Sequence, residues 1–135
     1  MEFYIHHVCI SVSDIEKSTQ FYRYFGFKEV ADYTAEDGSF RIKHLKLGDF
    51  IIELFWFSDH TPAVRKDLWD DLKTGGYRHI AFKVEDIHKT LEKLKKDKVA
   101  DTKTQVSIGR TGILYFFIRD PDGNFVEIVQ DNRNL

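Results

Sequence analysis

The sequence is poor in cysteine, has no excess of basic residues and has no long apolar run. Its single cysteine, Cys9, excludes a disulfide within the chain and is typical of a reducing compartment. The formal net charge of −2 excludes the basic surface that nucleic-acid-binding proteins use. No apolar run approaches the roughly 20 residues that cross a bilayer, and the start MEFYIHH is unlike a signal peptide. We therefore expect a cytoplasmic protein without a nucleic-acid or membrane partner.

The chain contains an internal repeat. The stretch HHVCISVSDIEKS aligns with RHIAFKVEDIHKT, so that His7 meets His79 at an offset of 72. The stretch FIIELFWF aligns with NFVEIVQD, so that Glu53 meets Glu127 at an offset of 74. Such self-similarity indicates two copies of one structural unit.

Each copy shows the same order of signals for secondary structure. Alternating apolar residues predict a first strand, and apolar residues at helical spacing predict a helix after it. Ser13 and Glu16 fit a capping box at the start of the first helix, Asp86 can cap the second, and Gly26 fits a left-handed helix end. Turn residues separate the later strands. The predicted strands span residues 4–12, 28–34, 40–47 and 50–56 in the first copy, and 78–84, 102–108, 112–119 and 124–130 in the second.

The pattern predicts an α+β fold built from two tandem βαβββ modules. Helices on one face of a mixed, mostly antiparallel sheet leave its other face free, and two such curved sheets can surround a cavity. We expect a single domain over residues 1–135. Its first module covers residues 1–57, a linker with a short helix near residues 64–72 covers 58–76, and the second module covers 77–135.

Two histidines and two glutamates stand out because they recur at equivalent places. Neighbouring side chains on a strand point to opposite faces, so His6 and His7 cannot share a site. Val8, Ile10 and Val12 form the apolar row that faces the helix, and His7 lies opposite that row. The same alternation places His79, Glu53 and Glu127 on the faces away from the helices.

These four residues predict a metal site. A glutamate among large apolar residues needs a partner, because an unpaired buried charge is costly. Two imidazoles and two carboxylates suit one divalent Ni, Co, Mn, Fe or Zn ion. His6, His44, His60 and His88 have no such repeated support and are interpreted as surface or hydrogen-bonded residues. We expect His7→Ala to reduce metal affinity and His6→Ala to leave it unchanged.

Further side chains on the same faces are candidates for substrate binding. Arg119, Phe117 and Tyr115 alternate with the core positions of their strand, and Arg119 can hold an anionic group. The alternative for Arg119 is an ion pair at the rim with Asp120 or Asp122. Phe55 and Phe57 either line an apolar pocket, with Phe125, or pack in the core.

The quoted repeats, together with RDPDGNFVEIVQ, resemble the vicinal oxygen chelate superfamily, which includes glyoxalases, bleomycin-resistance proteins and extradiol dioxygenases. The resemblance covers nearly the whole chain. It implies that His7, Glu53, His79 and Glu127 bind a metal that holds two adjacent substrate oxygens. It further implies a small-molecule substrate and a homodimer, with the modules paired either within one chain or across the dimer.

The four-ligand pattern is most similar to glyoxalase I, or lactoylglutathione lyase. The resemblance implies lyase or isomerase chemistry in which Glu127, or otherwise Glu53, carries a proton between adjacent carbons. Ser11 and Phe57 replace the arginine and asparagine that the glutathione-type enzymes carry, which argues against glutathione as the ligand. The alternatives are a metal-free binding protein of the bleomycin-resistance type, and an antibiotic-modifying or dioxygenase relative.

Overall fold

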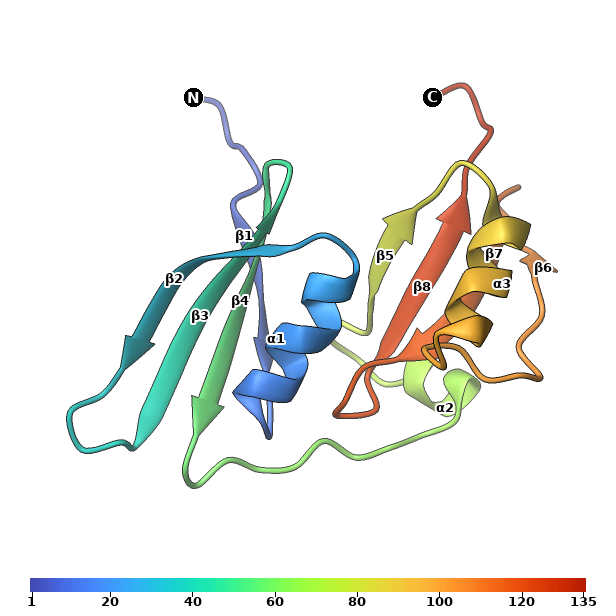
Figure 1. The fold of residues 1–135 in the computed structure, drawn as a ribbon. Helices are drawn as coiled ribbons and strands as arrows, with labels where there is room; N and C mark the ends of the chain where they lie inside the picture. The colour runs from blue at the N-terminus through green and yellow to red at the C-terminus, as the bar shows by residue number, and fades with distance from the viewer. The chain divides into compact units, whose positions relative to one another are not determined.

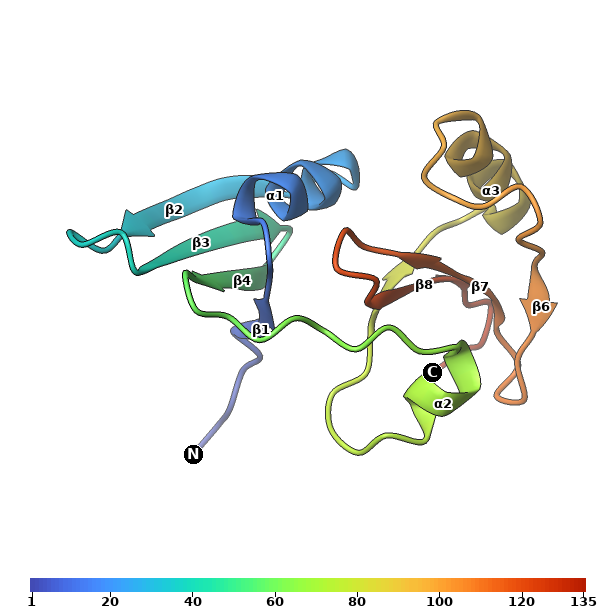
Figure 2. The ribbon, with the colours of Figure 1, turned by 90° about the horizontal axis from the view of Figure 1, so that it is seen from below.

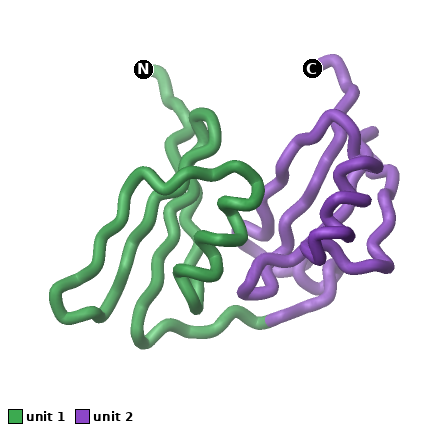
Figure 3. Tube along the Cα trace, in the orientation of Figure 1, with its two compact units in different colours: residues 1–64 green, residues 65–135 purple.

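The computed structural model describes all 135 residues, and the chain divides into two compact units. Unit 1 covers Met1–Val64 and unit 2 covers Arg65–Leu135 (Figure 3). The boundary falls inside the segment that the sequence predicts as a linker. Each unit is an α+β structure with one four-stranded mixed sheet, as expected.

Unit 1 follows the order βαβββ (Figure 1). Strand β1 pairs in parallel with β4, and the β2–β3 and β3–β4 pairs are antiparallel, which gives the sheet order β1-β4-β3-β2. The sequence predicts a first strand from residue 4, but β1 begins at His7. His7 lies opposite Ile51, and β4 begins at Phe50, so only one residue before His7 has a residue opposite it. The elements are β1 (His7–Ser11), α1 (Ile15–Tyr24), β2 (Lys28–Thr34), β3 (Phe40–Leu47) and β4 (Phe50–Phe57).

Unit 2 repeats this topology with the sheet order β5-β8-β7-β6, again with its first and last strands parallel. Strand β6 is much shorter than the predicted 102–108. The chain turns at Asp101, whose carboxylate accepts from the Lys103 amide, and only Ser107 and Ile108 pair with β7. The elements are α2 (Leu68–Leu72), β5 (Ile80–Lys83), α3 (Ile87–Lys96), β6 (Ser107–Ile108), β7 (Leu114–Arg119) and β8 (Phe125–Gln130).

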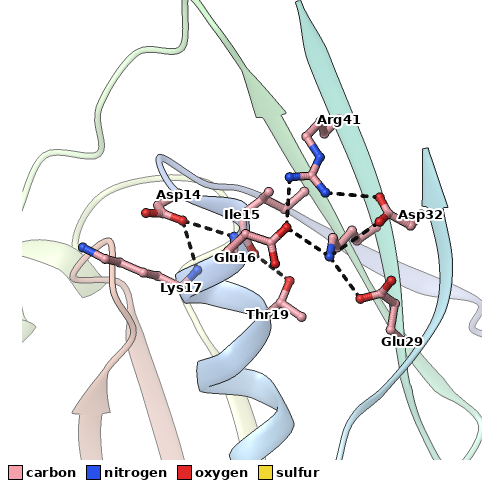
Figure 4. A network of polar contacts seen from close by, with 9 residues as sticks. Asp14, Ile15, Glu16, Lys17, Thr19, Glu29, Asp32 and Arg41 are labelled. Carbon is pink, nitrogen blue, oxygen red and sulfur yellow. Dashed lines mark hydrogen bonds and ion pairs between the residues drawn. The ribbon is translucent and has the colours of Figure 1, made fainter. Parts of the chain in front are cut away.

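The helix ends correct one prediction and confirm two. The Ser13–Glu16 capping box is wrong: Asp14 is the N-cap of α1, and its carboxylate accepts from the Glu16 and Lys17 amides (Figure 4). Asp14 has extended backbone immediately before the first helical residue, which brings its short side chain within reach of those donors. Asp86 caps α3 as predicted, and Gly26 follows α1 with a φ of 101°.

Each helix covers one face of its own sheet (Figure 2). Helix α1 packs against β3 and β4, and α3 packs against β8. The helices and the sheet faces beneath them bury apolar residues. They are Val12, Ile15, Tyr22, Leu45, Ile52 and Leu54 in unit 1 and Ile87, Leu91, Leu94, Phe116, Ile118, Val126 and Ile128 in unit 2. The other face of each sheet carries the histidines and glutamates.

A charged network crosses the helix-facing side of unit 1 (Figure 4). The buried Lys43 amine on β3 lies 3.1 Å from the Glu29 carboxylate, 3.3 Å from Glu16 and 3.7 Å from Asp32. Arg41 adds an ion pair of 2.9 Å to Glu16. Burial alone would lower the pKa of Lys43, but the hydrogen bond to Glu29 and the charges of Asp32 and Glu16 raise it above its ordinary value. Arg41 also lies 3.5 Å from Asp32, so the network joins α1, β2 and β3 through two cations.

None of the helices has both the length and the apolar character that crossing a lipid bilayer requires.

Candidate functional site

The open face of unit 1 gathers polar side chains around Glu53. In the sheet register, Glu53 lies directly opposite Cys9 on β1 and His44 on β3, so all three side chains share one face. The Nε2–H of His44 donates to Oε2 of Glu53 at 2.8 Å. On the other side, Nε2 of His7 lies 3.4 Å from Oε1 of Glu53. The Glu53 side chain is 19% exposed, so the carboxylate is largely shielded from water but still accessible.

The open face of unit 2 carries the equivalent pair in an apolar setting. Glu127 lies opposite Ala81 on β5 and Phe117 on β7, which are the counterparts of Cys9 and His44. The Nε2–H of His79 donates to Oε2 of Glu127 at 3.1 Å, and the Glu127 side chain is 15% exposed. The Phe117 ring stands edge-on to the His79 ring, with centroids 5.1 Å apart. We call His7 with Glu53 and His79 with Glu127 the two His–Glu pairs.

His6 lies closer to the site than strand alternation indicates. Its Nδ1 lies 2.8 Å from Nδ1 of His7, because His6 precedes the first residue of β1 and its backbone is not held in the sheet. If His7 uses Nε2 to bind a metal, its Nδ1 carries the proton and His6 accepts it. The expectation that His6→Ala leaves metal affinity unchanged stays a prediction, but His6 is a neighbour of the site.

His44 is the site residue that the sequence reasoning missed. The signal was the two-residue turn Gly48-Asp49, which joins β3 to β4 and sets their register. Counting outward from that turn pairs Leu47 with Phe50 and continues to His44 with Glu53. The repeat gave no hint, because the equivalent position in unit 2 is Phe117.

Both His–Glu pairs have donors and spacings that suit a metal ion. Neighbouring ligands at about 2.1 Å from one ion lie about 3.0 Å apart in octahedral geometry and about 3.4 Å apart in tetrahedral geometry. The nitrogen–oxygen distances of 3.4 Å and 3.1 Å match these values. Within neither unit do three or more histidine, cysteine, aspartate or glutamate side chains gather closely enough to hold an ion. Each unit therefore carries one pair of nitrogen and oxygen groups of the type that binds metal ions.

The Cys9 side chain lies on the same face of the sheet as Glu53, but its thiol has low reactivity. Partial burial raises the pKa of the Cys9 thiol, and the charge of Glu53 raises it further. The thiol form is therefore favoured over the thiolate, which is the nucleophile and metal ligand.

The Arg119 side chain is hydrogen-bonded to backbone carbonyls of unit 2. Its guanidinium donates to the carbonyl of Gly123 at 2.9 Å and to the carbonyl of Lys66 at 2.8 Å, and it stacks 4.0 Å over the Phe125 ring. The alternative ion pair with Asp120 or Asp122 is therefore not what holds it. Burial lowers the pKa of Arg119, as does the charge of Arg65, although Asp71 and Asp67 oppose this. A role for Arg119 in substrate binding stays a prediction.

The aromatic candidates line the open faces. Phe55 stacks on Phe57 with centroids 5.8 Å apart, and Phe57 stacks on Phe40 at 5.6 Å. In unit 2, Tyr115 and Phe125 each pack against Phe117 at 5.7 Å. Each face thus presents a row of rings next to its His–Glu pair.

Comparison with known proteins identifies the superfamily of the chain. Residues 4–128 match the Glyoxalase/Bleomycin resistance protein/Dioxygenase superfamily, and the chain belongs to that superfamily. It is 35% identical over 120 residues to "Uncharacterized protein YwkD" of Bacillus subtilis (strain 168), which covers 87% of this chain and 89% of that protein. It is 32% identical to a "Probable lactoylglutathione lyase" of Synechocystis sp., with 92% of both chains covered. It is 27% identical to human "Methylmalonyl-CoA epimerase, mitochondrial", with 93% of this chain and 73% of that protein covered.

A solved structure agrees with the fold. The crystal structure of the glyoxalase family protein from Enterococcus faecalis superimposes with a TM-score of 0.75 at 28% identity, covering 93% of this chain and 96% of that one. The resemblance that the repeats indicate is therefore confirmed at the level of superfamily and fold.

Proposed function

We propose that the protein is a metal-dependent enzyme that moves a proton on a small substrate with two adjacent oxygen atoms. The observation that carries the proposal is the repeated His–Glu pair, half-buried on the open face of each unit. His7, Glu53, His79 and Glu127 would together hold one divalent ion, of Ni, Co, Mn, Fe or Zn. When bound, such an ion supplies a Lewis acid that stabilises negative charge developing on the substrate oxygens.

Glu127 is the residue we assign to carry the proton. Its carboxylate is shielded from water, lies opposite the apolar Phe117 and Ala81, and has one polar partner, His79. Glu53 is the second choice, because His44 and His7 both lie against it.

The relatives indicate two substrate chemistries of this type, the lyase and the epimerase named above. We propose that the substrate is not a glutathione adduct, because Ser11 and Phe57 stand where the glutathione-type enzymes carry an arginine and an asparagine. The aromatic rows and Arg119 would line the substrate-binding surface, and the active form would be a homodimer.

A metal-free binding protein is the second candidate. The stacked rings of Phe40, Phe57 and Phe55 favour it, since such a row can hold a flat apolar ligand. It leaves the paired carboxylates without a role, which is why we rank it second.

The first test is metal content. Purified protein is stripped with a chelator, incubated with Ni²⁺ or Co²⁺, freed of excess ion and analysed by mass spectrometry of the elements. We expect stoichiometric binding that His7→Ala and His79→Ala each reduce strongly, while His88→Ala, at an exposed helix position, has no effect. Binding below about 0.2 ion per chain would support the metal-free alternative.

The second test separates the two carboxylates. The metal-loaded protein is offered methylmalonyl-CoA in D₂O, with lactoylglutathione as a glutathione adduct that it should not accept, and deuterium incorporation is followed by NMR. With a substrate found, Glu127→Gln should lower the exchange rate by about 10³-fold or more. Full exchange by Glu127→Gln would remove this residue as the proton carrier.

A further inference from the structure

The two glutamates are held differently, and the difference lies in one cross-strand neighbour. Both oxygens of Glu53 have a histidine nitrogen beside them, with His44 on Oε2 at 2.8 Å and His7 on Oε1 at 3.4 Å. Glu127 has one polar partner, because His79 contacts Oε2 and no side chain reaches Oε1. Phe117 occupies the place in unit 2 that His44 occupies in unit 1.

From this asymmetry we infer that His44 is a positioning residue that fixes Glu53 as a permanent ligand, so that Glu127 alone is free to move. The inference rests on the proposed metal site. The hydrogen bond from His44 occupies Oε2 of Glu53 and leaves Oε1 on the side of His7, where the proposed ion would bind. Glu53 is thereby oriented to bind through one oxygen, whereas Glu127 has no second donor that opposes its release.

The sheet makes this positioning rigid. His44 and Glu53 lie directly opposite each other in the β3–β4 hairpin, so their backbones hold the two side chains at a fixed separation. The His44 ring is also stacked on His7, with centroids 6.2 Å apart and planes at 23°. A partner that orients a ligand in this way typically changes metal affinity by 10–100-fold when it is removed.

The test compares His44→Phe, His44→Gln and His88→Phe. His44→Phe installs the residue of unit 2 and removes the donor, His44→Gln keeps an N–H donor, and His88→Phe makes the same change on an exposed turn of α3. Co²⁺ affinity is measured by chelator competition, and the visible spectrum of the Co²⁺ protein reports on the ligand geometry. Far-UV circular dichroism confirms that each variant folds.

We expect His44→Phe to weaken Co²⁺ binding by about 10–100-fold and to alter the visible spectrum. His44→Gln should remain within about threefold of the original protein, and His88→Phe should be unchanged. Unaltered affinity in His44→Phe would overturn the inference while leaving the proposed function intact. Equal losses in His44→Phe and His44→Gln would overturn it too, because His44 would then act as a ligand or through packing. Failure of the unaltered protein to bind Co²⁺ would overturn both proposals.

Discussion

Strands β3 and β7 occupy the same place in the two repeats, yet they present different side chains on both faces. On the side that faces the helix, β3 buries Lys43 among carboxylates, whereas β7 buries Phe116 among apolar residues. On the open side, β3 places His44 against its glutamate, whereas β7 places Phe117. The His–Glu pairs on the neighbouring strands are the same in both units.

The two units share the His–Glu pair and differ in the residues that β3 and β7 place beside it. The parallel pairing of the first and last strands positions His7 and Glu53 in unit 1 and Glu127 in unit 2, where His79 lies immediately before β5 and contacts Glu127. Strands β3 and β7 supply the neighbours of each pair, so substitutions on them change what holds each glutamate side chain. Two chemically identical pairs can therefore acquire different roles through substitutions on one strand.

The largest effect should come from breaking the charged face of β3. Replacing Lys43 with Met removes the cation that Glu29, Glu16 and Asp32 share, and leaves Arg41 to pair with Glu16 and Asp32 alone. We expect the free energy of unfolding to fall by about 2 kcal/mol, less than for a fully buried pair because these carboxylates are partly exposed. Urea denaturation followed by circular dichroism measures it.

The matched control for this change is Lys46→Met, at an exposed position of the same strand. It should alter stability by less than about 0.5 kcal/mol. Adding Glu29→Gln to Lys43→Met should recover part of the loss, since one of the repelling carboxylates is then neutral. A Lys43→Met protein as stable as the original would mean that the network does not stabilise unit 1.

The next effect should come from giving unit 2 the polar neighbour of unit 1. Phe117→His places a donor opposite Glu127, as His44 lies opposite Glu53. If Glu127 moves during the reaction, a second hydrogen bond should slow proton transfer about tenfold, or 1.4 kcal/mol, without weakening metal binding. The rate of deuterium exchange into the accepted substrate measures the first effect, and chelator competition measures the second.

Phe117→Leu serves as the control, because it changes the shape of the side chain without adding a donor. Its exchange rate should stay closer to that of the original protein than the rate of Phe117→His. An unchanged rate in Phe117→His would argue against Glu127 as the mobile base.

The fold and the repeated His–Glu pairs could be predicted from the sequence, because periodicity and self-similarity involve many residues of each element. The strands at residues 28–34 and 40–47 have the predicted bounds, and the open faces carry His7, Glu53 and Glu127 as alternation requires. The strand predicted over residues 78–84 begins only at Ile80, so His79 reaches Glu127 from the position just before β5. His44 was missed because its role comes from strand register and has no counterpart in the repeat. The contact of His6 with His7 depends on a backbone outside the strand, where alternation does not apply.

The smallest effect concerns the ends of the two helices, where the repeats place Gly26 after α1 and Lys98 after α3. Both have a positive φ, of 101° and 59°, and Lys98 is the only residue other than glycine with this conformation. A left-handed backbone costs a residue with a side chain about 1 kcal/mol. Glycine avoids this cost, but part of the gain is lost because glycine has more conformational freedom in the unfolded chain. Lys98→Gly should therefore raise the free energy of unfolding by about 0.5 kcal/mol. Glycine at Glu92, an exposed position in the middle of α3, should lower it by about 1 kcal/mol. Thermal unfolding of the two variants side by side makes the comparison, and a Lys98→Gly protein that melts no higher than the original would show that this position carries no strain.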